Sequence, residues 1–473
     1  MRVLFFTYCF GNAAGHAQIG VYKRGLRVAL ELQERGHDVF FDCTGRATYH
    51  DELTALAEDR IHFVDLHLDA LHDDGWEASR ERAVKALRDC RPDLVVVGEA
   101  PQVGTMLEAS LGAVEIGVPV VLLDNSYHPL AVPMFLRHHA GMMDGVVLTG
   151  PTCTHMREPP PNVRQVPPFV TSDLTEARRL LDELGLPVEK LVCALAYDPK
   201  VERLAFSLLQ RLEATDTHFL FMSRNPAELE QRVSGLSDEV RARVRVSGLL
   251  ADSVLFGLLE LSSLAVVKCG FMQATECLSL RTPVICAYQG TNWFRFLPSA
   301  CLPFIHVARE DEADFATVVA ASRFLELTED AMRSIHSGGF DASAQTADFL
   351  DTVAAQPSVR LRAETTKTFP EKHVQAAVRT AVGGRTVSVS QLRSMRLRSL
   401  PGEELYSVAC RCTMDGNERF VRLWAHRYSS AWGARRGRRN AALLGRQVLF
   451  TSLRHRLLIE PDIGPAELPP LVP

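Results

Sequence analysis

Residues 266–284 read VVKCGFMQATECLSLRTPV. The stretch opens on the end of an apolar run, Leu264 to Val267, which is typical of a buried strand. Lys268 and Gly270 break that run, and apolar residues with helical spacing follow until Pro283. Another apolar run begins there, so the predicted order is strand, glycine turn, short helix and strand.

Two interpretations of this turn are open. A glycine between strand and helix lets a ligand approach the backbone closely, and the free amides that begin a helix suit a phosphate or diphosphate. Glu276 lies six residues after Gly270 and offers a carboxylate to sugar hydroxyls. The same pattern also serves as a purely structural turn in any α/β domain.

The start of the chain has the same organisation. Residues 2–10 form an apolar strand candidate, and residues 11–16, GNAAGH, form a loop of small residues. A helical pattern runs from 17 to 35, Gly36 is placed to end it, and residues 39–41 continue as a strand. This βαβ unit with continuous apolar strands predicts a parallel sheet.

The alternation continues in two series joined by a proline-dense segment, residues 159–168. We expect that segment to be an interdomain linker, because proline excludes helix and central strand. The first series adds strands at 61–66, 93–97, 118–123 and 145–149, with helices at 76–90 and 103–116. The second has strands at 191–196, 218–222, 244–248, 264–267, 284–288 and 304–307, with helices at 201–212, 227–233, 253–261, 312–325 and 342–354.

Length and charge divide the chain into three parts. A chain of 473 residues predicts about three domains, which we place at 1–160, 168–355 and 356–473. The net charge is −5, yet the part from Pro357 onward holds 20 Lys and Arg against 9 Asp and Glu. The last part is therefore a basic module attached to an acidic body.

The basic module has a mixed α+β pattern, with short β-like runs at 378–390 and 405–423. Residues 409–414 and 419–424 predict a hairpin around Asp415-Gly416-Asn417, and residues 434–446 predict a basic helix. Its run from Arg435 to Arg439 suits a protein partner, phospholipid headgroups or nucleic acid, or else a solvated or interdomain face.

Composition excludes several other classes. No apolar run approaches the roughly 18 residues that a membrane span needs. The eleven cysteines are scattered without a CxxC pair, which indicates reduced thiols and a cytoplasmic protein. His128, His138 and His139 lack an accompanying set of carboxylates or cysteines, so we expect no metal site.

Three motifs together resemble the GT-B glycosyltransferases, over roughly residues 1–355. They are the first strand with GNAAGH and its helix, the segment KCGFMQATECLSLRTPVI, and the polar residues Gln289 to Trp293. The likeness is to the peptidoglycan UDP-GlcNAc transferase and the UDP-sugar transferases of natural products. It implies two Rossmann-like α/β domains facing across a cleft. The implied activity is metal-independent transfer of a sugar from a nucleotide-diphosphate donor to a small hydroxyl acceptor, with no further cofactor.

The resemblance also implies roles for individual residues. A histidine suits a general base, and a carboxylate behind it fixes its tautomer. His16 is thus a candidate base, an acceptor contact or a structural residue, and Glu99 or Asp124 would support it. Asn12 and Gly15 would lie near the acceptor. The donor would be bound by Lys268, Gly270, Phe271, Met272, Gln273, Glu276, Gln289, Asn292 and Arg224.

Two alternatives stay beside this interpretation. A nucleotide-sugar 2-epimerase shares the fold, and a non-catalytic scaffold subunit of a biosynthetic complex is the second. Phe271-Met272 stand where the family has a second glycine or a hydroxyl residue, which motivates the scaffold. The basic module faintly resembles the N-terminal lobe of aminoglycoside-type phosphotransferases through residues 400–424 and LLIEPDIG at 457–464. Leu423 or Trp424 stands at that lobe's usual lysine, so the likeness implies a docking role without catalysis.

Overall fold

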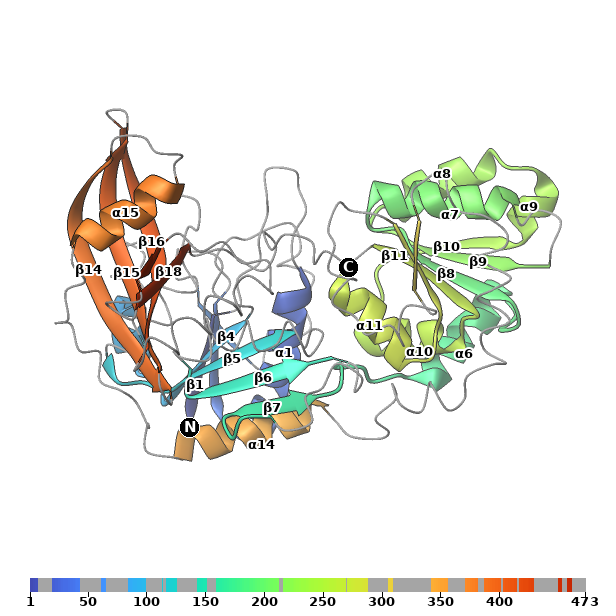
Figure 1. Cartoon of the computed structure of the whole chain (residues 1–473). Helices are drawn as coiled ribbons and strands as arrows, with labels where there is room; N and C mark the ends of the chain where they lie inside the picture. The colour runs from blue at the N-terminus through green and yellow to red at the C-terminus, as the bar shows by residue number, and fades with distance from the viewer. Residues whose placement is uncertain are drawn as a thin grey trace.

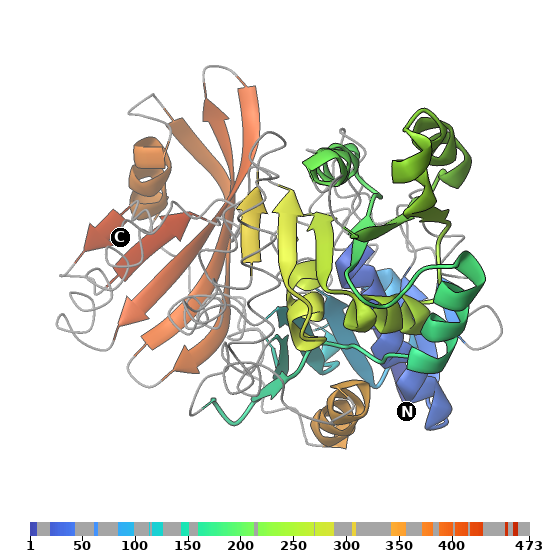
Figure 2. The ribbon, with the colours of Figure 1, turned by 90° about the vertical axis from the view of Figure 1, so that its right-hand side faces the viewer.

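The computed structural model of the chain describes most of two parallel sheets, their helices and a third sheet. It describes residues 1–6, 19–42, 61–64, 84–98, 113, 116–125, 143–150, 159–211, 216–268, 270–287, 305–308, 342–355, 371–381, 387–400, 403–414, 417–428, 450–452 and 457–461. Figures 1 and 2 show the three sheets as separate layers of the molecule.

The first sheet is parallel and has the strand order β3-β2-β1-β4-β5-β6-β7. Its core strands are apolar along their whole length because helices cover both faces of such sheets. All five residues of β4 and of β6 are buried. The strands are β1 (Arg2–Phe6), β2 (Asp38–Asp42), β3 (His62–Val64), β4 (Leu94–Gly98), β5 (Val120–Asn125), β6 (Gly145–Thr149) and β7 (Val163–Val166).

Strand β7 lies within the proline-dense segment. Residues 159–168 were expected to form a linker without a helix or a central strand, and Val163–Val166 forms a strand that pairs in parallel with β6. The prolines flank β7 at 159–161 and at 167–168 instead of lying within it. Because β7 is the last strand of the described sheet, proline beside it interrupts no central pairing.

The second sheet repeats this plan. Six parallel strands have the order β10-β9-β8-β11-β12-β13. The strands are β8 (Leu191–Leu195), β9 (His218–Met222), β10 (Val244–Ser247), β11 (Leu264–Lys268), β12 (Val284–Ala287) and β13 (Ile305–Ala308). The helices are α6 (Leu174–Leu184), α7 (Pro199–Arg211), α8 (Pro226–Ser234), α9 (Asp238–Ala242), α10 (Asp252–Leu261) and α11 (Phe271–Ser279).

Two helices matter for how the domains are joined. Helix α1 (Ile19–Glu34) packs on the first sheet, and α14 (Ala342–Ala355) lies against α1, β6 and β7 although it follows the second sheet in sequence (Figure 1). Arg35 Nη1 lies 2.6 Å from Asp348 Oδ1 of α14. A Cβ added at Gly145 would lie 2.8 Å from the Phe349 ring, so strand and helix are in close contact.

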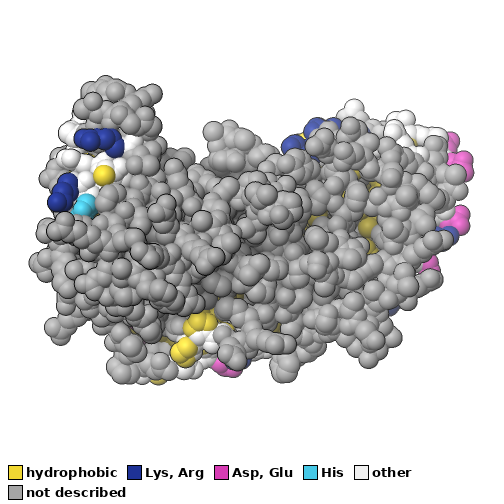
Figure 3. All heavy atoms as spheres, in the orientation of Figure 1, with side chains coloured by type: hydrophobic (Ala, Val, Ile, Leu, Met, Phe, Trp, Pro, Cys, Tyr) yellow, Lys and Arg dark blue, Asp and Glu magenta, His cyan; other side chains and the backbone are white. Residues whose placement is uncertain are grey.

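The C-terminal module consists of α15 (Glu371–Ala381) and an antiparallel sheet. Its strands are β14 (Val387–Leu400), β15 (Glu403–Met414), β16 (Asn417–Tyr428), β17 (Phe450–Ser452) and β18 (Leu457–Pro461), in the order β14-β15-β16-β18-β17. The module and the second domain lie on opposite sides of the first domain (Figure 1). On the face in Figure 3, basic side chains lie on the module and at the upper edge of the second domain, and acidic ones lie at the far end of the second domain and at the lower edge of the molecule.

The observed architecture confirms the predicted α/β fold with two Rossmann-like domains and an α+β module. The predicted hairpin is present as β15 and β16, which pair from Met414 with Asn417 onward. The β-like run expected over 378–390 is wrong in its first part, because α15 extends to Ala381. LLIEP lies between β16 and β17, and so is not an edge strand of the described sheet.

Some predictions concern residues outside the described ranges. The helix at 312–325, the basic helix at 434–446 and most of the helix at 103–116 are in this group. Among the described helices, none is long and apolar enough to cross a membrane. The three domain boundaries stay predictions.

Candidate functional site

The strand order of the second sheet locates a candidate site. From β8 the chain moves outward to β9 and β10 on one side, and from β11 to β12 and β13 on the other. At such a switch point the connections leave in opposite directions, and a crevice forms outside the carboxyl ends of the two central strands. Tyr197 and Asp198 follow β8, and Lys268 ends β11, so these residues border that point.

Charged side chains form a row along this edge. Lys268 Nζ lies 3.7 Å from the Asp198 carboxylate, and the two side chains are 34% and 7% exposed. Asp198 also accepts a hydrogen bond from the Lys200 amide at 2.9 Å, so its carboxylate is held at the start of α7. From β9, the Arg224 guanidinium lies 5.8 Å from the centre of the Tyr197 ring. The predicted donor residues Lys268 and Arg224 are thus brought to one edge.

Helix α11 begins beside this row, as the sequence predicts. Gly270 is its N-cap with φ −108° and ψ 138°, and no side chain caps the helix there. The amides of Phe271, Met272 and Gln273 belong to the first turn, where N–H groups have no partner within the helix. Helix geometry directs them past Gly270, and the helix dipole adds partial positive charge.

Gly270 has no conformational reason to be glycine. Its φ is accessible to every residue, and an added Cβ would meet only the Lys268 carbonyl oxygen, at 4.0 Å, among the described residues. A glycine that neither the backbone nor packing requires is consistent with a ligand that approaches closely. Of the two interpretations left open by the sequence, this geometry favours the ligand.

Glu276 lies in a charge cluster between the domains. We name Lys23, Arg27, Asp252 and Glu276 the interdomain charge cluster. Arg27 of α1 donates from Nη1 to Glu276 Oε1 at 3.3 Å and from Nη2 to Asp252 Oδ2 at 2.7 Å. Lys23, one turn earlier, donates to Asp252 Oδ1 at 2.5 Å. Helices α1, α10 and α11 therefore meet through opposite charges (Figure 1).

The pKa values of the two carboxylates of the cluster are shifted in opposite directions. Burial raises the pKa of Asp252, but the charges of Arg27 and Lys23 outweigh burial and lower it to about 2. Burial also raises the pKa of Glu276, and there Arg27 compensates only in part, because nearby Asp252 adds to the rise. Asp252 is thus the more acidic of the two carboxylates, and Arg27 is the larger of the two cationic influences that favour the ionised form of Glu276.

The first sheet has its own switch point between β1 and β4. Phe6 pairs with Val97, so both strands end at the same edge. Glu99 follows β4 directly, and Asn12, Gly15 and His16 follow β1. These four residues, like Gln289 and Asn292 after β12, lie outside the described residues, and their roles stay predictions.

The strand predicted at 118–123 extends to Asn125, so Asp124 lies within it. Asp124 belongs to β5, is 2% exposed, and accepts a hydrogen bond from the Asn125 amide at 2.7 Å. Asn125 accepts at 2.5 Å from Nη1 of Arg24, a fully buried arginine of α1 that also donates to the Leu123 carbonyl at 3.2 Å. Support of His16 by Asp124 stays a prediction.

The sequence reasoning missed Arg24, Arg27 and Asp252. The available signal was the run KRGLR at 23–27, which places Lys23 and Arg27 one turn apart on helix α1. A cation at a buried helical position needs a partner, which can be far away in sequence. Asp252 stands 225 positions after Arg27, so spacing alone does not identify it.

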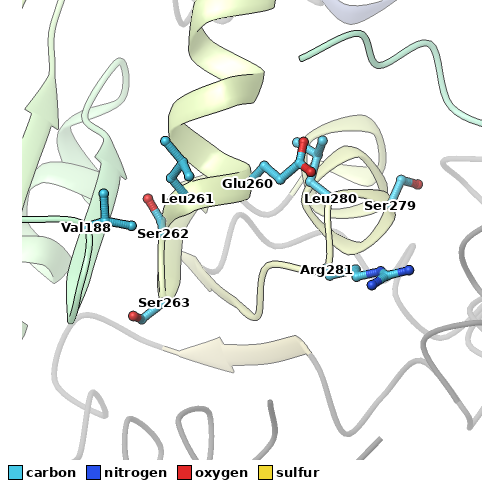
Figure 4. A pocket seen from close by; sticks show the side chains of 8 residues that line it. All are labelled: Val188, Glu260, Leu261, Ser262, Ser263, Ser279, Leu280 and Arg281. Atoms are coloured by element: carbon cyan, nitrogen blue, oxygen red, sulfur yellow. The ribbon is translucent and has the colours of Figure 1, made fainter. Parts of the chain in front are cut away.

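A cavity of about 590 Å³ lies elsewhere on the second domain (Figure 4). Ser263 precedes β11 and Arg281 precedes β12, so this cavity is at the amino ends of the strands. Two of its serines are satisfied by their own helices, since Ser262 and Ser279 donate to the Leu258 and Thr275 carbonyls. Ligands of parallel α/β sheets bind at the opposite edge.

No described group of histidine, cysteine or acidic residues is arranged to hold a metal ion. No protein-family model matches the chain. No curated protein matches it in sequence either.

Solved structures similar to this chain include three with comparable coverage. MurG of Acinetobacter baumannii has a TM-score of 0.49 and 14% identity, covering 74% of this chain and 99% of that one. UDP-GlcNAc 2-epimerase from Neisseria meningitidis bound to UDP-GlcNAc has a TM-score of 0.48 and 15% identity, covering 74% of this chain and 100% of that one. The glycosyltransferase SnogD from Streptomyces nogalater has a TM-score of 0.44 and 18% identity, covering 75% of this chain and 99% of that one.

Proposed function

We propose that the chain is a glycosyltransferase that moves a sugar from a nucleotide-diphosphate donor, preferably a UDP-sugar, to a hydroxyl of a small acceptor. The supporting observation is the start of α11 at the switch point of the second sheet. There Gly270 leaves space, Lys268 and Arg224 supply positive charge, and Glu276 faces the first domain. Amides and cations of this kind suit a diphosphate.

The proposed reaction is an inverting substitution at the anomeric carbon. The acceptor oxygen forms a bond to that carbon while the bond to the diphosphate oxygen breaks, and the diphosphate leaves with the electron pair. His16 takes the acceptor proton, and Glu99 or Asp124 supports the resulting imidazolium. The α11 amides, Lys268 and Arg224 stabilise the charge that develops on the leaving group.

Replacement of Gly270 by alanine separates a ligand site from a structural turn. We expect Gly270→Ala to leave the melting temperature unchanged, because the new Cβ meets only the Lys268 carbonyl oxygen at 4.0 Å among the described residues. Affinity for UDP should fall about tenfold, because the methyl group occupies the approach of the diphosphate. Titration calorimetry with UDP, together with thermal melting, measures both.

Gly248→Ala is the matched control. An added Cβ there meets no described atom within 4 Å, and Gly248 directly follows β10, two strands from β8. This variant should bind UDP like the wild type. A Gly270→Ala protein that melts early, or that binds UDP normally, would show that the glycine serves the turn alone. Failure of the wild type to bind any UDP-, TDP- or GDP-sugar would reject the donor site itself.

Glu276 and His16 should affect different steps. Glu276→Ala removes an acceptor of hydrogen bonds from the donor ribose, so the dissociation constant of UDP should rise about tenfold. His16→Ala should leave that constant unchanged and lower turnover by a factor of about 10² to 10⁴, as expected for loss of a general base. Calorimetry measures UDP binding, and mass spectrometry of the product measures turnover. Equal loss of UDP binding in both variants would contradict the separate roles given to Glu276 and His16.

Two other functions make different predictions in the same assays. A 2-epimerase would change UDP-GlcNAc without any acceptor, which proton NMR detects as a second sugar epimer. A scaffold subunit would bind no nucleotide sugar. Phe271 and Met272, which stand in place of a second glycine or a hydroxyl residue, favour the scaffold subunit.

A further inference from the structure

The contact between Arg27 and Glu276 joins the two proposed half-sites. Arg27 belongs to α1 of the first domain, and Glu276 belongs to α11 of the second, 249 positions later. Among the described residues, Arg27 is the only hydrogen-bond or ion-pair partner of the Glu276 carboxylate, and it contacts only Oε1. Within that same set, Oε2 receives no hydrogen bond and is left for another donor.

Arg27 is held in place without Glu276. Its guanidinium donates to Asp252 Oδ2 at 2.7 Å and to the Phe169 carbonyl oxygen, and it lies 4.8 Å from the centre of the Phe256 ring. All three partners belong to the second domain or to the segment that leads into it. The contact with Glu276, at 3.3 Å, is the longest of the hydrogen bonds. Arg27 is thus held in place mainly by groups other than Glu276. Its positive charge in turn favours the ionised form of Glu276.

The electrostatics explain why Glu276 needs this cation. Its side chain is 13% exposed, and an isolated carboxylate at such a place would bind a proton. The charged groups near it are Arg27 and Lys23 of α1, which favour the ionised form, and Asp252 of α10, which opposes it. An ionised carboxylate accepts two hydroxyl donors, whereas a protonated one loses acceptor capacity.

We propose that Arg27 is a positioning residue for the donor nucleotide, supplied by the first domain to keep Glu276 ionised and oriented toward the ribose hydroxyls. This inference rests on the proposed function. The donor half-site is then complete only while α1 is docked on α10 and α11. The acceptor domain therefore contributes to nucleotide binding without touching the nucleotide.

The test is the pH dependence of UDP binding in four proteins, measured by calorimetry from about pH 5 to about pH 9. In the wild type, affinity should decrease as the pH falls through the raised pKa of Glu276. Arg27→Met should lower the affinity for UDP about tenfold near neutral pH. It should also move the pH midpoint of the binding curve upward, so that alkaline solution restores binding. Arg27→Lys keeps the charge and should return most of the affinity and the original midpoint.

Lys23→Met is the matched control. Lys23 lies one turn before Arg27 and pairs with Asp252, but makes no hydrogen bond to Glu276 among the described contacts. Its loss should move the midpoint less than the loss of Arg27. Thermal melting accompanies every variant, and Arg27→Lys keeps the test valid if Arg27→Met does not fold.

The outcomes separate this inference from the function on which it rests. A wild type that binds no UDP would reject the proposed function. A wild type that binds, together with an Arg27→Met protein of equal affinity and equal midpoint, would overturn the positioning role alone. A loss of affinity that is the same at every pH would also overturn it, because a merely structural arginine has no effect on the titration of Glu276.

Discussion

Replacing Gly257 with valine should destabilise the second domain by about 3 kcal/mol, near the upper end of the effect of overpacking a tight core. Gly257 is where α10 crosses α6, and an added Cβ would lie 2.5 Å from the Asp173 carbonyl oxygen and 2.8 Å from Ala177 Cβ. Real Cβ atoms do not come that close to a backbone atom. One of the two helices must therefore move.

Neither helix is free to move. The Asp173 carbonyl accepts from the Ala177 amide at 3.0 Å, and the Asp173 amide donates to the Ser253 carbonyl at 2.9 Å, which ties α6 to the start of α10. The Asp173 side chain also caps α6 through the Glu176 amide. Urea unfolding followed by circular dichroism measures the loss. Gly248→Val is the control and should unfold like the wild type, because its Cβ enters open space among the described residues.

Replacing Asp252 with alanine should cost about 3 kcal/mol, because at a partly buried interface it removes the carboxylate partner of Lys23 and leaves Arg27 with only its longer carboxylate contact, to Glu276. Asp252 is 25% exposed and binds both Lys23 and Arg27, which are themselves 27% and 17% exposed. Its loss acts on the contact between the domains as well as on α10. Chemical unfolding should show a lower midpoint, and small-angle scattering should show a larger radius of gyration.

The decrease of the free energy of unfolding at acid pH provides a second measurement of Asp252. The folded-state pKa of Asp252 is about 2, below the ordinary 3.8, so its contribution is fully present above about pH 4 and is lost as the pH falls toward 2. That contribution is about 2 kcal/mol. Glu276 acts with the opposite sign, because its raised pKa makes its contribution fall as the pH rises through that value.

Asp216→Ala is the comparison for Asp252. The pair of Lys190 and Asp216 has a similar distance of 3.2 Å, but the side chains are 61% and 90% exposed. Ion pairs in water contribute between about 0 and 1 kcal/mol, so this variant should be nearly neutral. Equal stabilities of the two variants would show that the interdomain charge cluster is no stronger than a surface pair.

Most of the parallel strands are well predicted because they are short apolar runs closed by a residue that ends them, whereas β7 (VRQV) is not such a run and was not predicted. β9 lies at 218–222 and β6 at 145–149, as expected. Helix α6 is missed because LTEARRLLDEL is charged on most of its surface, and reasoning from apolar runs passes over it. Its cap residues, Asp173 and Gly185, are both present in the sequence, so attention to capping would have found it.

The candidate site is only partly accessible to reasoning from sequence. Gly270 and Glu276 are found from local spacing, because a strand, a turn and a helix are contiguous. The partner of Glu276 cannot be predicted from local spacing, because Arg27 belongs to a different domain. Only the contact between the two domains brings α1 to α11. Phe271 and Met272 look unsuited to a phosphate as side chains, yet their contribution as first-turn residues would come from backbone amides, which do not depend on side-chain identity.

Helix α14 has a consequence for the order in which the chain is made and folded. Ala342, Ala347, Leu350 and Val353 pack in the core of the first sheet, together with Val121 and Val147. On a ribosome these residues are synthesised about 190 residues after β6, on the order of 10 to 40 seconds later. The nascent first domain therefore lacks the part of its core that α14 supplies beside α1, β6 and β7 while the whole second domain is synthesised. A fragment that stops before residue 342 would lack it permanently, and would be a substrate for chaperones.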